Sequence, residues 1–438
     1  MIFAKIIYLT ITLFVLYFGF LCTLTLEPVQ RGLLFINGLT IGSNETLYHP
    51  ETSGFAKNQV APFWLETPDG EKLFGWHILP LDVYESHQAE LRAIETTQDT
   101  IDSGELAQIH LSILRDDPHA HVIIYYHGNS GCISSMHRPD IYRALLSTSP
   151  AHTHLFIVDY RGFGISTGVP SEEDLITDGA HTAQAILKLT GVSPANTVLA
   201  GQSLGTAVAI GAADLLARAD PPVEFKALIP IAGFASVEEV VKSFRVFGLV
   251  PIIGPVVYLP ITQTLISRFL RYPFHSDVKL ERFVRNSRKT KVLIVHSFED
   301  PEIPFFHGEK LVEAALRGAL EADEDISEKD YLEMELTHLE RFVSMEEDER
   351  KGVFEVVSMA EQQSREYVFF QRFSDNSTSE ERVEIERLVK EEEESVISVP
   401  IGDEVRRISM LAIKWGGHNT IPKSSDVVLA IRSVLYND

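Results

Sequence analysis

The sequence is poor in cysteine and in positive charge. Its 438 residues include only two cysteines, Cys22 and Cys132, which are too few for a disulfide framework and do not identify a cellular compartment. Lysine and arginine number 38 against 62 acidic residues, so the net charge is -24. Nucleic-acid binding needs a basic face, and this composition argues against a nucleic-acid partner.

The acidity is concentrated in one segment. Between Leu320 and Val405 there are 27 acidic and 9 basic residues, which account for -18 of the net charge of -24. The runs Glu346–Glu349 and Glu391–Glu394 are typical of solvated chain, so we predict an acidic, partly disordered insertion over residues 321–405. The segment lacks spaced histidine or cysteine ligands, and we expect neither a metal nor a cofactor.

The N-terminus carries a long apolar run. Ile6 to Leu26 is 21 residues without a charge, and about 20 apolar residues span a bilayer core as a helix. We therefore predict an N-terminal membrane anchor over residues 1–30, formed by one transmembrane helix. A cleaved signal peptide is the alternative, although its apolar region is typically shorter. Lys5 and Arg31 flank the run symmetrically and leave the orientation open.

Two glycosylation sequons fit a lumenal location of the rest of the chain. They are Asn44-Glu-Thr and Asn376-Ser-Thr. Asn44 and Asn376 are therefore candidate glycosylation sites.

The middle of the chain alternates apolar strands with helices. This pattern predicts an α/β fold with a mostly parallel central sheet covered by helices on both faces. A Pro-Asp-Gly turn predicts a hairpin over 60–81, and the polar stretch 82–118 is expected to be a surface loop with at most one helix. The expected strands of the regular part lie at 121–126, 155–159, 198–200, 227–232, 291–296 and 409–414.

A second insertion is expected over residues 233–290. It contains Val246 to Ser267, 22 uncharged residues that include three prolines. Prolines inside a helix remove backbone donors and clash with the preceding turn, so this run does not suit a membrane-spanning helix. We interpret it as an apolar lid over the site, resting in the membrane interface. A buried helical pair is the alternative.

The stretch Gly201-Gln-Ser-Leu-Gly205 lies between an apolar strand and a helix of small residues. A G-x-S-x-G sequence in this setting predicts a nucleophile elbow with Ser203 at its tip. The turn is so tight that side chains two positions on either side would collide, which explains both glycines. A strand-to-helix turn that merely contains a serine is the other interpretation.

A serine nucleophile needs a base and an orienting acid, which follow it along the chain in the order acid, then histidine. Asp300 lies beside a prolyl turn after a strand and is the expected acid, with Glu299 as the fallback. His418, in Trp415-Gly-Gly-His-Asn419 after the last strand, is the expected base. His127 precedes the nucleophile, and His307 begins a helix, so both fit less well.

The oxyanion of a tetrahedral intermediate needs two backbone donors. The N–H of Leu204, which follows the nucleophile, is the first candidate. The second is the N–H of Asn129, because the glycines of His127-Gly-Asn-Ser-Gly131 let the backbone face the site.

The motifs HGNSG, DYRGFGISTG, GQSLG, HSFEDPEIP and GGHN together resemble the α/β-hydrolase superfamily. Within it they are similar to the membrane-anchored abhydrolase domain-containing proteins of the protein 12-like group, which hydrolyse monoacylglycerols and lysophosphatidylserine. The resemblance covers residues 60–320 with 406–438, taken as the hydrolase domain. It implies Ser203 as nucleophile, Asp300 as acid, His418 as base and a single-pass protein of the endoplasmic reticulum. The acidic insertion departs from the group's pattern.

The sequence therefore favours a membrane-anchored serine hydrolase that cleaves acyl esters of lipids through an acyl-enzyme on Ser203. Its expected partners are a lipid ester and a membrane. A protein depalmitoylase is one alternative, because related hydrolases share the motifs. A catalytically silent membrane interaction protein, with the acidic segment as its binding surface, is the alternative from another class.

Overall fold

The computed structural model describes residues 2–38, 44–243, 245–246, 250–251, 260–322, 394–401, 406–413 and 416–436. Most of the predicted acidic insertion, including the run Glu346–Glu349 and the sequon at Asn376, lies outside these residues. Much of the apolar run from Val246 to Ser267 lies outside them as well.

Within the described residues, the main sheet has nine strands in the order β1-β2-β4-β3-β5-β6-β9-β11-β10. The strands from β4 to β11 in this order run parallel, whereas β1–β2, β2–β4 and β10–β11 pair antiparallel. The predicted mostly parallel sheet is confirmed. The strands are β1 Val60–Glu66, β2 Lys72–Ile78, β3 His121–Tyr126, β4 Thr153–Val158, β5 Thr197–Gln202, β6 Ala227–Ile231, β9 Lys291–Ser297, β10 Glu394–Ile401 and β11 Arg406–Ile413.

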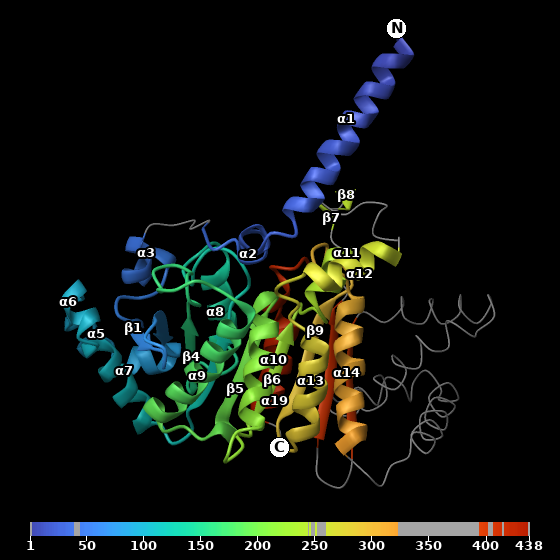
Figure 1. Ribbon diagram of the computed structural model, residues 1–438. Coiled ribbons are helices and arrows are strands. Elements are labelled where there is room, and N and C mark those ends of the chain that lie inside the picture. The colour runs from blue at the N-terminus through green and yellow to red at the C-terminus, as the bar shows by residue number, and fades with distance from the viewer. Residues whose placement is uncertain are drawn as a thin grey trace.

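Helices cover both faces of this sheet (Figure 1). Successive side chains of a strand point to opposite faces, so Val122 and Ile124 join one core cluster and Ile123 joins the other. The first cluster packs under α9 Glu172–Thr190, α10 Leu204–Ala217, α13 Ser276–Asn286 and α14 Phe306–Ala322. The second packs under α8 Arg138–Leu146 and α19 Ser425–Tyr436. Burial on both faces explains why these strands read as continuous apolar runs.

The structure differs from the sequence prediction at β10. This strand lies inside the range assigned to the acidic insertion and pairs with β11 at the end of the sheet. Its sequence after Glu394 is rich in β-branched residues, which favour strands, and Pro400 is compatible with an edge strand. The neighbouring acidic run masked this signal.

The stretch 82–118 is helical, and the prediction of a surface loop with at most one helix was wrong. It forms α4 Leu81–Ser86, α5 Gln88–Ala93, α6 Gln98–Asp102 and α7 Glu105–Asp116. Thr97 and Thr100 exchange side-chain and backbone hydrogen bonds at the start of α6, a capping box. Leu106, Leu111 and Leu114 of α7 are buried. Their helical spacing was available in the sequence.

The N-terminal apolar run forms the helix α1 Ile2–Thr23, followed by the shorter α2 Glu27–Phe35. Figure 1 shows α1 projecting away from the body of the protein. Among the described residues, no helix is both long enough and apolar enough to cross a membrane, so the predicted transmembrane helix is not confirmed.

The predicted lid range contains α11 Val237–Ser243, the short strands β7 Arg245–Val246 and β8 Val250–Pro251, α12 Pro260–Phe269 and α13. Of these, α13 packs against α10 and α14, with Leu280 and Phe283 fully buried in the main core. This part of the range is therefore a layer helix of the fold rather than a cover over the site.

Three histidines are buried together beneath the hairpin: His77 on β2, His110 on α7 and His154 on β4. Nε2 of His77 lies 3.1 Å from Nδ1 of His154, and His110 Nε2 donates a hydrogen bond of 2.9 Å to the carbonyl of Asn58. Burial disfavours the charged imidazolium, which lowers the pKa of His110 to about 4 and that of His154 to about 3.

We expect this cluster to make the fold acid-labile. The unfolded histidines take up protons below pH 6.5 while the folded ones stay neutral, so stability falls as the pH drops from 6.5 towards 4. At pH 5 the loss is about 2 kcal/mol for each of His110 and His154. Urea unfolding between pH 7 and pH 4.5 measures it, and a His154→Leu variant should show a shallower dependence. An equal dependence in this variant would contradict the assignment.

Candidate active site

Ser203 occupies the turn between β5 and α10 in a strained conformation. Its φ is 53° and its ψ is -120°, which side chains rarely adopt. A Cβ at Gly205 would lie 2.0 Å from the carbonyl oxygen of Tyr126, and one at Gly201 would lie 2.2 Å from the carbonyl oxygen of Gly205. Both positions therefore require glycine, as the sequence indicated. The turn raises Ser203 at the carboxyl end of the parallel strands, where α/β sheets bind ligands.

Asp300 and His418 meet although 118 residues separate them. Nδ1 of His418 donates a hydrogen bond of 2.7 Å to Oδ2 of Asp300, and both residues are buried. The other carboxylate oxygen of Asp300 accepts the backbone N–H groups of Glu302 and Ile303, each at 2.9 Å. The turn after β9 thus orients the carboxylate, which in turn fixes the imidazole. Glu299, the fallback acid, is exposed.

The contact between Asp300 and His418 also shifts the pKa of each residue. Burial alone would raise the pKa of Asp300, but the hydrogen bond and charge of His418 outweigh it and hold that pKa below its usual value. Burial alone would lower the pKa of His418, yet Asp300 raises it above 6.5, with a smaller contribution from Glu302. An imidazole held in this way is suited to receive a proton.

Gln202 joins the histidine loop to the elbow, a role that sequence reasoning missed. Its Nε2 donates to the carbonyl of His418 at 3.0 Å, and its Oε1 accepts the hydroxyl of Tyr125 at 3.0 Å. Because Gln202 directly precedes Ser203, this bond holds the His418 loop beside the serine. The variable position of G-x-S-x-G carries no general signal for such a contact.

The loop after β3 lies against Ser203. A Cβ at Gly128 would sit 3.5 Å from the Cβ of Ser203, so the backbone of this loop reaches the serine. Leu204 is the first residue of α10, and its N–H has no acceptor within the helix. The two segments predicted to supply oxyanion donors therefore flank the same side chain.

Arg138 orients this loop. Its guanidinium donates to the carbonyls of Gly128, Asn129 and Ser130 at 2.9, 3.0 and 2.7 Å. In a trans peptide the carbonyl and the next N–H point in opposite directions. Because the carbonyl of Gly128 points towards Arg138, the N–H of Asn129 points away from it. Arg138 was not identified from the sequence, since nothing in its neighbourhood distinguishes it from a surface arginine.

His127 is fully buried within the loop. Its Nδ1 donates to the carbonyl of Gly128 at 2.7 Å, and its Nε2 lies 3.2 Å from Oδ1 of Asp159. The same oxygen of Asp159 accepts the backbone N–H of Ile133. These contacts make His127 a structural residue of the loop. His307 is buried, and its ring nitrogens lie within hydrogen-bond distance of the N–H of Ala235 and the hydroxyl of Ser243.

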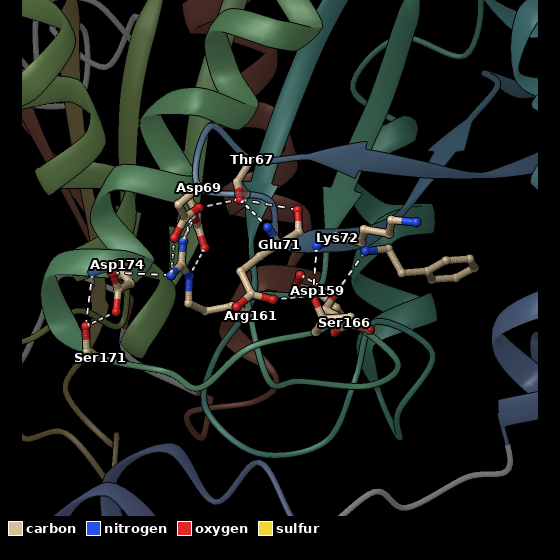
Figure 2. Close-up of polar contacts among 12 residues, drawn as sticks. Thr67, Asp69, Glu71, Lys72, Asp159, Arg161, Ser166, Ser171 and Asp174 are labelled. Carbon is tan, nitrogen blue, oxygen red and sulfur yellow. Dashed lines mark hydrogen bonds and ion pairs between the residues drawn. The ribbon is translucent and has the colours of Figure 1, made fainter.

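A buried ion cluster supports the loop that follows β4. Arg161 donates to both carboxylate oxygens of Asp178, each at 2.6 Å, and to Asp69 at 3.0 and 3.2 Å. Asp174 at the start of α9 lies 3.3 Å away. Figure 2 shows Asp69 and Asp174 converging on the guanidinium from two different elements. The hydrogen bond to Asp178 raises the pKa of Arg161, so the cation persists at every physiological pH.

The residues that the structure describes contain no group of three or more histidine, cysteine, aspartate or glutamate side chains placed to hold a metal ion.

Comparison with known proteins finds similar sequences and similar folds. The chain is 27% identical to the lysophosphatidylserine lipase ABHD12 of Mus musculus over 290 residues, which cover 66% of this chain and 64% of that protein. The chain is also 28% identical to the lysophosphatidylserine lipase ABHD12 of Danio rerio over 293 residues, which cover 66% of each chain. The human protein ABHD12B is 30% identical over 44% of this chain and 49% of its own length. The matched region spans just under two thirds of the mouse lipase.

No established family profile matches the chain. Among solved structures, an α/β-hydrolase from Vibrio vulnificus aligns with 67% of this chain and 84% of its own, at 17% identity and a TM-score of 0.43.

The acid limb of the pH–activity profile should lie above pH 6.5, because His418, the predicted base, must be neutral to accept a proton and its pKa is raised. Glu302 contributes to this shift from 4.0 Å. A Glu302→Gln variant should therefore move the acid limb of kcat/KM to lower pH. Glu299→Gln, a matched change at the exposed neighbour, should leave it in place. Equal shifts in both variants would contradict the assignment.

Replacing Arg161 should destabilise the protein far more than replacing its exposed partner. An Arg161→Met variant leaves Asp178 buried without its cation and should cost about 3–5 kcal/mol. An Asp69→Asn variant removes an exposed partner whose attraction to Arg161 is screened by water, and it should cost much less. Urea unfolding of both variants tests this. Equal losses would show that the cluster is not organised around the buried Arg161–Asp178 pair.

Proposed function

We propose that the protein is a serine hydrolase that cleaves acyl esters of lipids, with monoacylglycerols or lysophospholipids as substrates. The observation that carries the proposal is the Asp300–His418 pair, which Gln202 connects to the strained turn at Ser203. The similarity to ABHD12 lysophosphatidylserine lipases supports a lipid ester as the substrate class.

In the proposed mechanism, Oγ of Ser203 attacks the ester carbonyl while Nε2 of His418 takes the hydroxyl proton. Asp300 stabilises the resulting imidazolium through Nδ1. The oxyanion receives hydrogen bonds from the backbone N–H groups of Leu204 and Asn129. His418 then protonates the leaving alcohol, which departs and leaves an acyl-enzyme on Ser203.

The second half of the cycle repeats these steps with water. His418 accepts a proton from water as its oxygen attacks the acyl carbonyl. Collapse of the second oxyanion returns the proton to Ser203 and releases the fatty acid.

The proposal includes attachment to a membrane through α1. Several large apolar side chains of this helix are exposed, among them Ile11, Leu16 and Phe18 at 57%, 64% and 60%. Large exposed apolar surfaces mark interaction sites for lipid or protein. Such attachment would place the site beside its substrates. A single-pass arrangement in the endoplasmic reticulum stays a prediction, as does a glycan at Asn44 or Asn376.

The test is covalent labelling with a fluorophosphonate, followed by a substrate panel. Ser203→Ala should abolish labelling and lower ester turnover by about a factor of 10⁴ or more, because the nucleophile is lost. Ser86→Ala, at an exposed serine of α4, should label like the wild type. Thermal unfolding should show that both variants are folded.

The panel should contain a monoacylglycerol, lysophosphatidylserine and a palmitoyl thioester, and it separates the lipase from a depalmitoylase. Persistent labelling of Ser203→Ala would overturn the mechanism. Faster hydrolysis of the palmitoyl thioester than of the two lipid esters would overturn the proposed substrate class.

A further inference from the structure

The short helix α2 contacts the active-site loop directly, although it follows α1 and precedes the hydrolase fold in the chain. Only residues 24–26 separate α1 from α2. Phe35, the last residue of α2, is fully buried in the first core cluster. Its ring packs edge-on against Phe163, Tyr272 and Phe274, with centroid distances of 5.4–6.4 Å. The helix is therefore part of the folded body rather than a tether.

The carboxyl end of α2 holds the loop that follows β3. The carbonyl of Phe35 accepts the backbone N–H of Ser130 at 2.9 Å, and the carbonyl of Leu34 accepts Nδ2 of Asn129 at 3.3 Å. The next residue, Ile36, has a φ of 47°, a strained value for a β-branched side chain. This strained residue directly follows the two carbonyls of α2 that accept hydrogen bonds from the loop.

The loop is thus held from two sides. Arg138 binds its carbonyls, and α2 binds an N–H and a side chain of the same residues. Ser130 and Gly131 both have positive φ, 60° and 61°, so the loop has no regular structure of its own to keep its shape. Its geometry depends on these external contacts.

The middle of α2 is attached to the end of α12 and to the segment that follows it. Gln30 donates from Nε2 to the carbonyl of Phe269 at 2.8 Å and accepts the N–H of Arg271 on Oε1 at 2.8 Å. Nε of Arg31 donates to the hydroxyl of Tyr272 at 3.2 Å. These bonds determine where α2 lies relative to the loop.

We propose that α2 is a positioning element of the active site, which places the oxyanion donor of Asn129 by holding the loop through the carbonyls of Leu34 and Phe35. The inference rests on the proposed serine-hydrolase function. It implies that the N-terminal region contributes to the chemical step as well as to location, because a displacement of α2 moves an oxyanion donor.

Two variants of the full-length chain test this with p-nitrophenyl butyrate, a water-soluble ester that needs no membrane. Asn129→Ala removes the side-chain bond to Leu34 but keeps the backbone N–H. Gln30→Ala loosens α2 without touching the loop. Since a lost oxyanion donor costs about 10²–10³ in kcat, a displaced donor should lower kcat about tenfold in Asn129→Ala and at least about threefold in Gln30→Ala. KM should stay within about twofold, because the donor acts in the transition state.

Leu33→Gln is the matched control. Leu33 lies on α2 but is 60% exposed, so this variant should keep the wild-type kcat. Thermal unfolding should give similar midpoints for all variants, which separates positioning from loss of fold. If Gln30→Ala proves unstable, Arg31→Met replaces it, because it loosens the same attachment.

The outcomes are distinguishable. Loss of kcat in both variants with KM unchanged supports the positioning role. The positioning role is overturned if kcat of Gln30→Ala or its replacement stays within twofold of the wild type. It is also overturned if the variants change KM and leave kcat unaltered. A failure of the proposed function would appear instead as full turnover by Ser203→Ala in the same assay.

Discussion

The close approach between the first turn of α10 and the end of β3 is the contact on which the site depends. Gly205 lies so near the carbonyl of Tyr126 that no side chain fits between them. This approach gives Ser203 its strained backbone and brings the loop after β3 alongside it. The segments that contain Leu204 and Gly128 flank the serine for the same reason. A larger residue at Gly205 would separate the proposed nucleophile from its proposed oxyanion donors.

The loops around this contact are irregular, and buried polar groups hold them in place. Arg138 donates hydrogen bonds to three successive carbonyls of the loop after β3. The contacts of Asp159 with His127 and Ile133 join the same loop to the end of β4. Arg161 then ties the loop after β4 to the hairpin turn and to α9. Within this cluster Arg161 and Asp178 are both buried, and separating them would leave an unpaired buried charge, which is costly.

The parts of the fold that follow from local pattern were predictable. Apolar strands alternating with helices indicated the parallel sheet, and the Pro-Asp-Gly turn indicated the β1–β2 hairpin. The same approach failed at 82–118, where a polar stretch forms four helices, and at β10, whose β-branched sequence follows an acidic run. The helix α13 was also predicted to belong to a lid, because the sequence of an amphipathic helix does not show which element its apolar face contacts.

The sequence by itself determined the elbow and the identity of the three residues proposed for catalysis. Their residue types, their order and their places after strands are local properties of the chain. Tertiary structure alone decided how the site is assembled. The hydrogen bond between Asp300 and His418, the bond from Gln202 to the histidine loop and the bond from Asn129 to α2 all join distant segments. Such contacts depend on how strands and helices pack in space, and no local pattern encodes that.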